Sequence, residues 1–392
     1  MLTFIRRGVI VILFLLAAFY GIPRIIAPLI ERLLNRVRLR PPYQVQEETR
    51  TLHKQLFIVD LHADPLLWKR DLLQRSRYGH VDFPRLAEGN VSLQVFAAAT
   101  KIPVTINFES NPARSDLLVP LTLIQAWPRR TWYSLLQRAL YQAEKLQEFI
   151  SQDPDRLLLI KNRNNLDQLL AGRESEQPLI GALLALEGVH ALEGDIANLD
   201  VLYYKGFRMI GLAHFIDNEA GGSAHGRQKG GLTPFGREIV LQVEQKRMVL
   251  DLAHASAQLI DDVLNLATAP LIVSHTGVRG VCDSPRNISD DHVRGIAATG
   301  GLIGIALFEE TVCGTTIDDT ARTMRYVADL VGVDHVALGS DYDGAITAPM
   351  DTSGMVLLTE ALLTQDFTAD ETAKIMGGNA LSVLQSILPD QD

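Results

Sequence analysis

Eight short apolar runs recur along the chain, and they constrain its fold more than any other feature. They occupy residues 56–61, 91–98, 179–186, 207–213, 248–253, 270–274, 301–307 and 335–340. Runs of this length are typical of parallel strands whose two faces are both covered by helices. Eight is the number of strands that closes a (β/α)8 barrel. The sequence therefore predicts an α/β fold of this TIM-like type.

Segments with helical periodicity separate many of these runs. Apolar residues recur at steps of three and four through residues 136–150, which indicates an amphipathic helix. Further helices are expected at residues 257–266, 290–298, 320–331 and 369–377. The long interval 100–178 is expected to be an insertion with helices of its own. A doubly wound open sheet is the alternative, but its first strand is normally followed by a glycine-rich turn, where this chain has DLHADP.

The N-terminal segment has a different character. Residues 8–23 are uncharged and mostly apolar, with Arg6 and Arg7 before them and Arg24 after them. The segment is shorter than the roughly 20 residues of a full membrane span, and a signal peptide or a buried core helix are the alternatives. No clear A-x-A cleavage site follows it. We expect an uncleaved, single-pass membrane anchor helix, whose orientation the arginine count leaves open.

The distribution of charge separates this segment from the rest of the chain. Residues 1–40 contain seven arginines and one acid, a balance of +6, whereas the remainder has 30 basic and 45 acidic residues, a balance of −15. A chain segment this acidic is not expected to bind nucleic acid in general. The Pro41-Pro42 pair ends any helix. We therefore expect an anchor with a basic collar in residues 1–42 and a catalytic domain in residues 43–392.

The cysteine content excludes two classes of small fold. Cys282 and Cys313 are the two cysteines of the chain. They are too few for a disulfide scaffold, and no C-x-x-C pair provides a thiolate zinc site. Their spacing leaves open whether they form a bridge.

Acidic and histidine residues stand at the ends of six of the eight predicted strands. They are Asp60, His62 and Asp64 after the first, Glu187 after the third, His214 after the fourth, His254 after the fifth, His275 after the sixth, and Asp341 and Asp343 after the eighth. In a barrel, all of these ends open onto the face that holds the active site. Serines and threonines would serve equally well as helix caps, so this residue choice indicates a functional site rather than capping.

The residue types at these ends suit a metal centre. His62 and Asp64 are two positions apart, so in a strand they point the same way and can reach one ion together. Three imidazoles and two carboxylates fit a divalent metal of the zinc class, and five ligands exceed the needs of one tetrahedral ion. Two ions sharing a carboxylate could hold a hydroxide between them and clamp a reacting carbonyl. Asp341 would then be the spare carboxylate that moves protons.

The motifs together resemble those of a known family. The set DLHAD, ALEGVHAL, GLAHFIDNEAGGSAHG, VLDLAHAS, LIVSHTGV, SPRNISDD and VALGSDYDG, in this order, is similar to that of the membrane dipeptidase family, metallopeptidase family M19. The resemblance extends from about residue 56 to residue 387. It implies a (β/α)8 barrel that binds two zinc ions and cleaves dipeptides.

The resemblance also implies roles for single residues. The first zinc ion would be bound by His62 and Asp64 and the second by His254 and His275, with Glu187 bridging the two. His214 would contact the scissile carbonyl, and Asp341 would be the proton shuttle. Arg286 would pair with the terminal carboxylate of the substrate, which suits its planar fork. The first motif departs from the family's usual D-G-H-N-D at Leu61 and Ala63. The ligands survive, so this departure bears on packing beside the metal and on substrate range.

We therefore expect a zinc-dependent dipeptidase with two Zn²⁺ per chain, held at a membrane with its catalytic domain outside the cytoplasm. The alternatives are another binuclear amidohydrolase, acting on a lactone or an N-acyl amino acid, and a catalytically silent membrane-anchored metal binder. The amidohydrolases more often begin with H-x-H and bridge through a modified lysine, whereas here Asp64 and Glu187 take those positions. The sequence leaves open whether the chain forms a homodimer.

Overall fold

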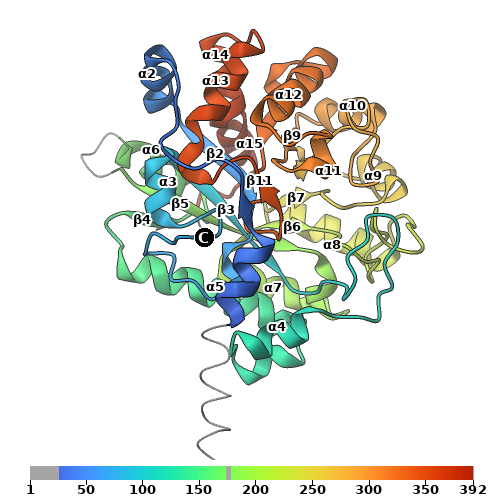
Figure 1. Cartoon of the computed structure of the whole chain (residues 1–392). Helices are drawn as coiled ribbons and strands as arrows, with labels where there is room; N and C mark the ends of the chain where they lie inside the picture. The colour runs from blue at the N-terminus through green and yellow to red at the C-terminus, as the bar shows by residue number, and fades with distance from the viewer. Residues whose placement is uncertain (1–25, 174–177, 392) are drawn as a thin grey trace, which may run out of the picture.

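The computed structural model describes residues 26–173 and 178–391, and its centre is a closed ring of eight parallel strands (Figure 1). The ring consists of β2 (Ile58–Ala63), β3 (Val91–Ala99), β5 (Ile180–Glu187), β6 (Phe207–Gly211), β7 (Val249–Asp251), β8 (Leu271–Thr276), β9 (Leu302–Ile305) and β10 (Val336–Leu338). Each strand pairs with the next in this order, and β10 pairs with β2 to close the ring. All eight predicted strands are confirmed.

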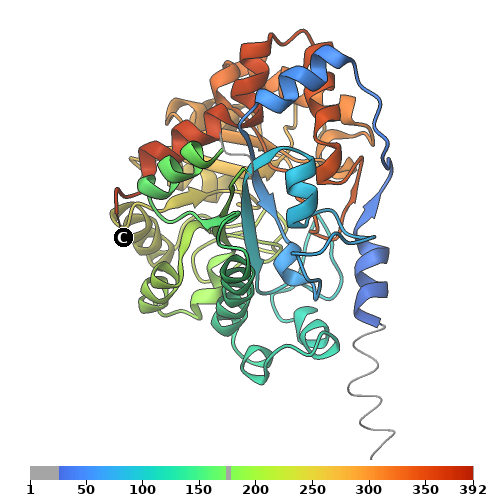
Figure 2. The ribbon, with the colours of Figure 1, turned by 90° about the vertical axis from the view of Figure 1, so that its left-hand side faces the viewer.

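Helices surround this ring (Figures 1 and 2). They are α2 (Glu47–Gln55), α3 (Phe83–Glu88), α4 (Leu118–Ile124), α5 (Leu135–Gln152), α6 (Arg163–Gly172), α7 (Ala197–Lys205), α8 (Pro234–Gln245), α9 (Ala257–Leu264), α10 (Asp290–Ala298), α11 (Glu309–Val312), α12 (Ile317–Val331), α13 (Val356–Thr364), α14 (Ala369–Ala373) and α15 (Asn379–Ile387). Between β3 and β5, the segment 100–178 contains α4, α5, α6 and the short strand β4 (Leu157–Leu159), which pairs with the first residues of β5.

Several helices begin where a side chain satisfies a free backbone amide. Ser256 accepts a hydrogen bond from the amide of Leu259 ahead of α9, and Ser289 accepts one from His292 ahead of α10. Such a cap contributes on the order of 1 kcal/mol to helix stability. Because both helices follow strands of the ring, these caps help to fix the loops that carry site residues.

The apolar core ties every strand of the ring to its surroundings. One cluster of buried apolar side chains takes members from all eight ring strands and continues onto α6 and α15. A second, larger cluster packs the strands against the outer helices. The carboxyl ends of the strands are therefore held by a packed core, and the residues that follow them share a rigid base.

The structure also places the N-terminal arm, which we define as residues 26–40, against the barrel (Figure 2). Residues 26–34 are helical, and β1 (Arg36–Val37) pairs with β11 (Thr347–Ala348) in a separate two-stranded sheet. Glu31 and Asn35 are buried. The boundary after residue 42 stays a prediction, but the described part of the 1–42 segment packs onto the catalytic domain.

The predicted anchor, residues 8–23, lies outside the described residues. Within residues 26–173 and 178–391, none of the helices combines the length and the hydropathy needed to cross a bilayer. The two cysteines form a disulfide, Cys282–Cys313, a pairing that the sequence left open.

Candidate active site

The eight predicted site residues meet at the carboxyl ends of the ring strands. Six of them line a cavity of about 400 Å³, namely Asp64, Glu187, His214, His254, Arg286 and Asp341. His62, in β2, and His275, in β8, are buried against them. The residues come from β2, β5 and β8 and from the loops after β2, β6, β7, β8 and β10. Segments up to 279 positions apart in the sequence, from His62 to Asp341, are thus brought together by the barrel.

The carboxylate of Glu187 lies at the centre of this group. Its Oε1 is 3.2 Å from Nε2 of His254, 3.4 Å from Nε2 of His275 and 3.5 Å from Nε2 of His62. Its Oε2 is 3.2 Å from Nε2 of His214. The same Nε2 atom of His62 is also 3.3 Å from Oδ2 of Asp64. One carboxylate therefore contacts four imidazoles, and three of them meet at the same oxygen.

These contacts define two of the three groups of donor atoms in the described residues that lie close enough together to hold an ion, the third being His62, Asp251 and His275. One set is His62, Asp64 and Glu187, and the other is Glu187, His254 and His275. They coincide with the two ligand sets predicted from the sequence, and Glu187 belongs to both. Imidazole nitrogens and carboxylate oxygens are the donors that zinc-class ions take in catalytic sites.

The hydrogen bonding of these atoms also fits a cation site. The buried atoms Nε2 of His62 and Oδ1 of Asp64 have no hydrogen-bond partner. The Nε2 atoms of His254 and His275 face one another at 3.0 Å, and both also lie within 3.4 Å of Oε1 of Glu187. Buried polar atoms are normally satisfied within the protein. A divalent ion would satisfy these at once, so the donor set fits a metal centre.

The electrostatics of the group point the same way. Burial lowers the pKa of His254 and His275 well below their ordinary value, which keeps both rings neutral, the form that binds metals. Burial, together with the charge of Asp64, raises the pKa of Glu187 well above its ordinary value. Although burial alone would lower it, the carboxylates of Asp64 and Glu187 raise the pKa of His62 to about 10. The excess of buried acid therefore draws protons onto Glu187 and His62, and a bound dication would take the place of those protons.

Asp341 is the remaining carboxylate of the cavity. It follows β10 in a loop where its backbone has a φ of 61°. Burial raises its pKa to about 7, and the charge of Asp64 adds to this effect while that of His62 opposes it. A carboxyl group with a pKa near neutrality can both accept and return a proton at physiological pH.

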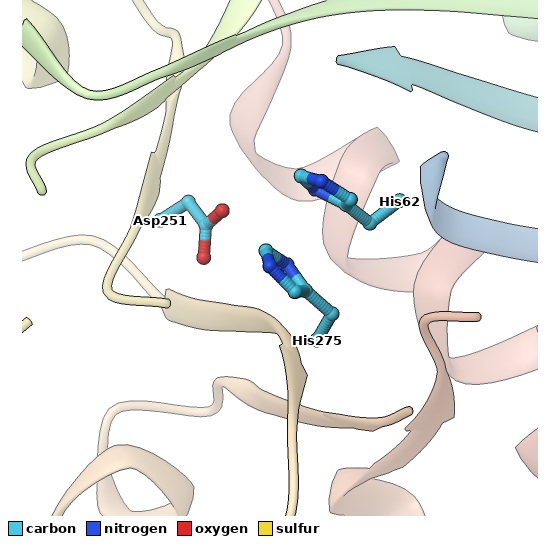
Figure 3. A group of neighbouring side chains, drawn as sticks. All are labelled: His62, Asp251 and His275. Atoms are coloured by element: carbon cyan, nitrogen blue, oxygen red, sulfur yellow. The ribbon is translucent and has the colours of Figure 1, made fainter. Parts of the chain in front are cut away.

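Asp251 is a site residue that the sequence analysis missed. Figure 3 shows its carboxylate facing the rings of His62 and His275, whose centroids are 3.6 Å apart. Asp251 accepts hydrogen bonds from the amide and the hydroxyl of Ser274, at 2.8 and 2.6 Å. The Ser274 hydroxyl in turn contacts Nδ1 of His275 at 2.8 Å.

This chain of contacts fixes the protonation of His275. Because the Ser274 hydroxyl donates to Asp251, its lone pairs accept from Nδ1–H of His275, and Nε2 is left free of a proton. Such outer carboxylates orient metal-binding histidines and increase their basicity. The signal in the sequence was an acid inside an apolar run, VLDLAH, which resembles IVDLHAD in the first strand.

Asp60 has the same arrangement between β2 and the end of β10. It accepts hydrogen bonds from the amide and the hydroxyl of Ser340, at 2.8 and 2.6 Å. Ser340 directly precedes Asp341, and its hydroxyl also contacts the carbonyl of His62 at 3.1 Å. Each of these aspartates therefore reaches across to the serine that precedes a site residue on the neighbouring strand.

Arg286 and His214 flank the two donor sets. Arg286 is buried in the loop between β8 and α10, where it donates to the carbonyl of His275 at 2.7 Å and lies 3.4 Å from Nε2 of His254. His214 contacts the carbonyl of Lys101 through Nδ1 at 3.3 Å. Both side chains face the same cavity, whose remaining walls include Ile102, Phe215 and other apolar residues.

The disulfide supports the loop that carries Arg286. Cys282 precedes Arg286 in this loop, and Cys313 directly follows α11, whose Glu309 and Glu310 also line the cavity. Asn287 adds hydrogen bonds to the carbonyls of Cys282 and Thr311, both at 2.8 Å. The loop is therefore joined to α11 and the residue after it by one covalent link, Cys282–Cys313, and one polar link, from Asn287 to Thr311.

The N-terminal arm holds the loop that carries Asp341. The carbonyls of Ile346 and Ala348 accept from the amides of Arg36 and Arg38, and the side chain of Asn35 accepts from the amide of Ala345 at 2.8 Å. This loop is under backbone strain, because Asp341, Asp343 and Ala345 have φ values of 61°, 63° and 64°.

Asp343 also anchors this loop, through partners outside the two donor sets. It pairs with Arg70, which is also bonded to Glu31 of the arm and to the carbonyl of Val81. Burial alone would raise the pKa of Asp343. The positive charge of Arg70 outweighs this effect and, together with His80, holds the pKa of Asp343 below its usual range. Arg70 therefore links the arm to the strained loop through one buried cation.

The comparisons with known proteins agree with this geometry. The family model of membrane dipeptidases, peptidase family M19, matches residues 46–388. The dipeptidase aclJ of Aspergillus oryzae is 27% identical over 351 residues, which cover 84% of this chain and 78% of the relative.

Solved structures show the same fold. A metallopeptidase from Rhodobacter sphaeroides, liganded with a phosphinate mimic of the dipeptide L-Ala-D-Ala, has a TM-score of 0.70 at 22% identity, covering 85% of this chain and 99% of that one. The probable dipeptidase PvdM from Pseudomonas aeruginosa has a TM-score of 0.73 at 17% identity, covering 87% and 98%. Because the family match spans nearly the whole described barrel and every predicted site residue, the chain belongs to the membrane dipeptidase family, M19, and is a metallopeptidase of that type.

Proposed function

We propose that the protein is a dipeptidase with two zinc ions per chain, bridged by Glu187. The observation that carries this proposal is the position of Glu187 Oε1, which lies within 3.5 Å of Nε2 atoms from both donor sets. His62 and Asp64 would hold one ion, and His254 and His275 the other. Bound zinc-class ions supply a Lewis acid for the scissile carbonyl and lower the pKa of water, so that a hydroxide can act as the nucleophile.

The chain's own side chains supply the proton transfers. Asp341 takes the proton of the attacking water and gives it to the leaving amine, a role open to it because it faces the cavity and belongs to neither donor set. His214 faces the carbonyl oxygen. Burial lowers the pKa of His214 well below its ordinary value, so its ring is neutral, and its Nδ1 is directed at the Lys101 carbonyl at 3.3 Å.

Arg286 sets the length of the substrate in this proposal. It would pair with the free carboxylate at the C-terminus, beside the donor sets that would hold the metal, so that one residue would fit after the cleaved bond. The dipeptide mimic bound by the Rhodobacter sphaeroides relative supports a substrate of this length. The cavity volume of about 400 Å³ and its apolar walls favour dipeptides with apolar side chains.

We further propose that residues 8–23 tether the enzyme to a membrane and that the catalytic domain lies outside the cytoplasm. The disulfide Cys282–Cys313 supports this location, because disulfides persist in oxidising compartments.

Turnover of a dipeptide panel tests the enzymatic proposal. The purified protein should hydrolyse L-Ala-L-Ala or L-Ala-D-Ala, lose activity when a chelator removes the metal, and regain it with zinc. A chelator-resistant activity, or hydrolysis of lactones or N-acyl amino acids in place of dipeptides, would contradict it.

A further inference from the structure

A second cavity, of about 860 Å³, lies between the N-terminal arm and the loop that precedes α3. Six arginines line it, together with Tyr78, Ser76 and Asp351 among other residues. The arginines are Arg32, Arg36 and Arg40 of the arm, Arg75 and Arg77 of the loop, and Arg85 of α3. This cavity is separate from the metal centre and has no part in the proposed hydrolysis.

Few of these arginines are neutralised by acids. Arg85 pairs with Asp82 and Asp351, and Arg75 pairs with Glu88. In the part of the chain that the structure describes, Arg32, Arg40 and Arg77 form no ion pair, and Arg36 donates to the carbonyl of Leu33. Asp351, the acid that lines the cavity, is already engaged by Arg85 and Tyr43. The cavity is therefore strongly basic, in a chain whose residues 41–392 carry a balance of −15.

Exposed apolar side chains accompany these arginines on the arm. Leu29 is 52% exposed, Leu33 61% and Leu39 50%. Leu29 and Leu33 lie one helical turn apart, so they share a face of the helical segment. A free inorganic anion would not contact this apolar helix face, whereas a phospholipid presents a phosphate and an apolar region side by side.

We propose that this cavity binds the headgroup of an anionic phospholipid. The phosphate lies among Arg32, Arg36, Arg40 and Arg77, and the exposed leucines of the arm enter the boundary between headgroups and acyl chains. The apolar residues 8–23 precede the arm, which places this cavity beside the bilayer if the proposed tether holds. The inference extends that tether to a specific lipid class and does not depend on the dipeptidase activity.

Lipid retention by the full-length chain tests the proposal. The protein in an uncharged detergent is incubated with equal amounts of phosphatidylglycerol and phosphatidylcholine, repurified, and its bound phospholipid counted by native mass spectrometry. The double variant Arg32→Gln/Arg77→Gln is compared with Arg114→Gln/Arg237→Gln, which removes the same charge from exposed arginines elsewhere.

The wild type and the control variant should retain phosphatidylglycerol in preference to phosphatidylcholine. The double variant should lose roughly 10- to 30-fold of that preference, since each arginine near an anionic headgroup contributes about 1 kcal/mol. In 0.5 M salt the preference should weaken. Equal retention of both lipids, an equal loss in the control variant, or displacement of phosphatidylglycerol by inorganic phosphate would each overturn the proposal. Sedimentation of the full chain with membranes is measured separately, so a failure of the proposed tether can be distinguished from a failure of lipid binding by the cavity.

Discussion

Replacing Arg70 by lysine should weaken both the fold and the catalytic step. Its three guanidinium nitrogens have three different partners, the carboxylates of Glu31 and Asp343 and the carbonyl of Val81. Lysine keeps the charge, but its compact ammonium cannot span acceptors that the planar fork of arginine reaches. At least one buried carboxylate then loses its hydrogen-bonded cation.

The size of the effect follows from the burial of this group. Arg70, Glu31 and Asp343 are all buried. Breaking such a pair costs about 3–5 kcal/mol, a large share of the roughly 5–15 kcal/mol that stabilises a typical domain. The variant should therefore fold with a lower free energy of unfolding. Because Asp343 lies two residues from Asp341 in the strained loop, kcat should fall while the metal content stays unchanged.

Chemical denaturation, dipeptide kinetics and metal analysis measure these three quantities. Arg75→Lys is the matched control, because Arg75 forms a bidentate pair with Glu88 in which both side chains are 43% exposed. An exposed pair contributes about 0–1 kcal/mol, so the control should behave like the wild type. If the free energy of unfolding of Arg70→Lys lies within about 1 kcal/mol of the wild-type value and kcat is unchanged, the arm does not support the loop as described.

Three further changes test other parts of the account. Wild type should prefer a dipeptide to its C-terminal amide by about 10- to 150-fold in kcat/KM, and this ratio should fall toward one in Arg286→Ala. If the mutant keeps the wild-type ratio, Arg286 does not bind the substrate carboxylate. Asp251→Asn should lower zinc affinity by about 10- to 100-fold in a chelator competition, and an unchanged affinity would show that His275 needs no support through Ser274. Burial raises the pKa of Glu31 from its ordinary 4.5 to about 7. Between pH 4.5 and 7 the folded state then holds a proton that the unfolded state releases. The contribution of Glu31 to stability should therefore fall as the pH rises from 4.5 to 7. The difference in free energy of unfolding between wild type and Glu31→Gln should change only across that pH range. A difference that stays constant with pH would mean that Glu31 does not titrate there.

The eight barrel strands and the residues at their ends could be predicted because both are local features of the sequence. A buried parallel strand is a short apolar run, and an acid or histidine directly after it is visible without any knowledge of its neighbours. Closure of the barrel predicted that these residues share one face, whereas their division into two ligand sets around Glu187 was implied by the resemblance to the membrane dipeptidase family.

Other features depend on pairings that no local pattern encodes. Asp251 acts through Ser274, 23 positions away, and Asp60 acts through Ser340, 280 positions away. The strands β1 and β11 have two residues each, too few for any periodicity, and they join segments more than 300 positions apart. Arg70 occurs in no recognisable motif, and its role depends on Glu31 and Asp343 meeting it from opposite ends of the chain.

Metal stoichiometry measured together with activity tests the central claim most directly. Metal-free protein is titrated with zinc, and bound zinc per chain is followed by elemental analysis while hydrolysis of a dipeptide is recorded in the same samples. The shared position of Glu187 predicts two zinc ions per chain at full activity, and the variant His254→Ala should lose at least one ion and nearly all turnover. Full activity with one zinc ion or fewer per chain would contradict the account.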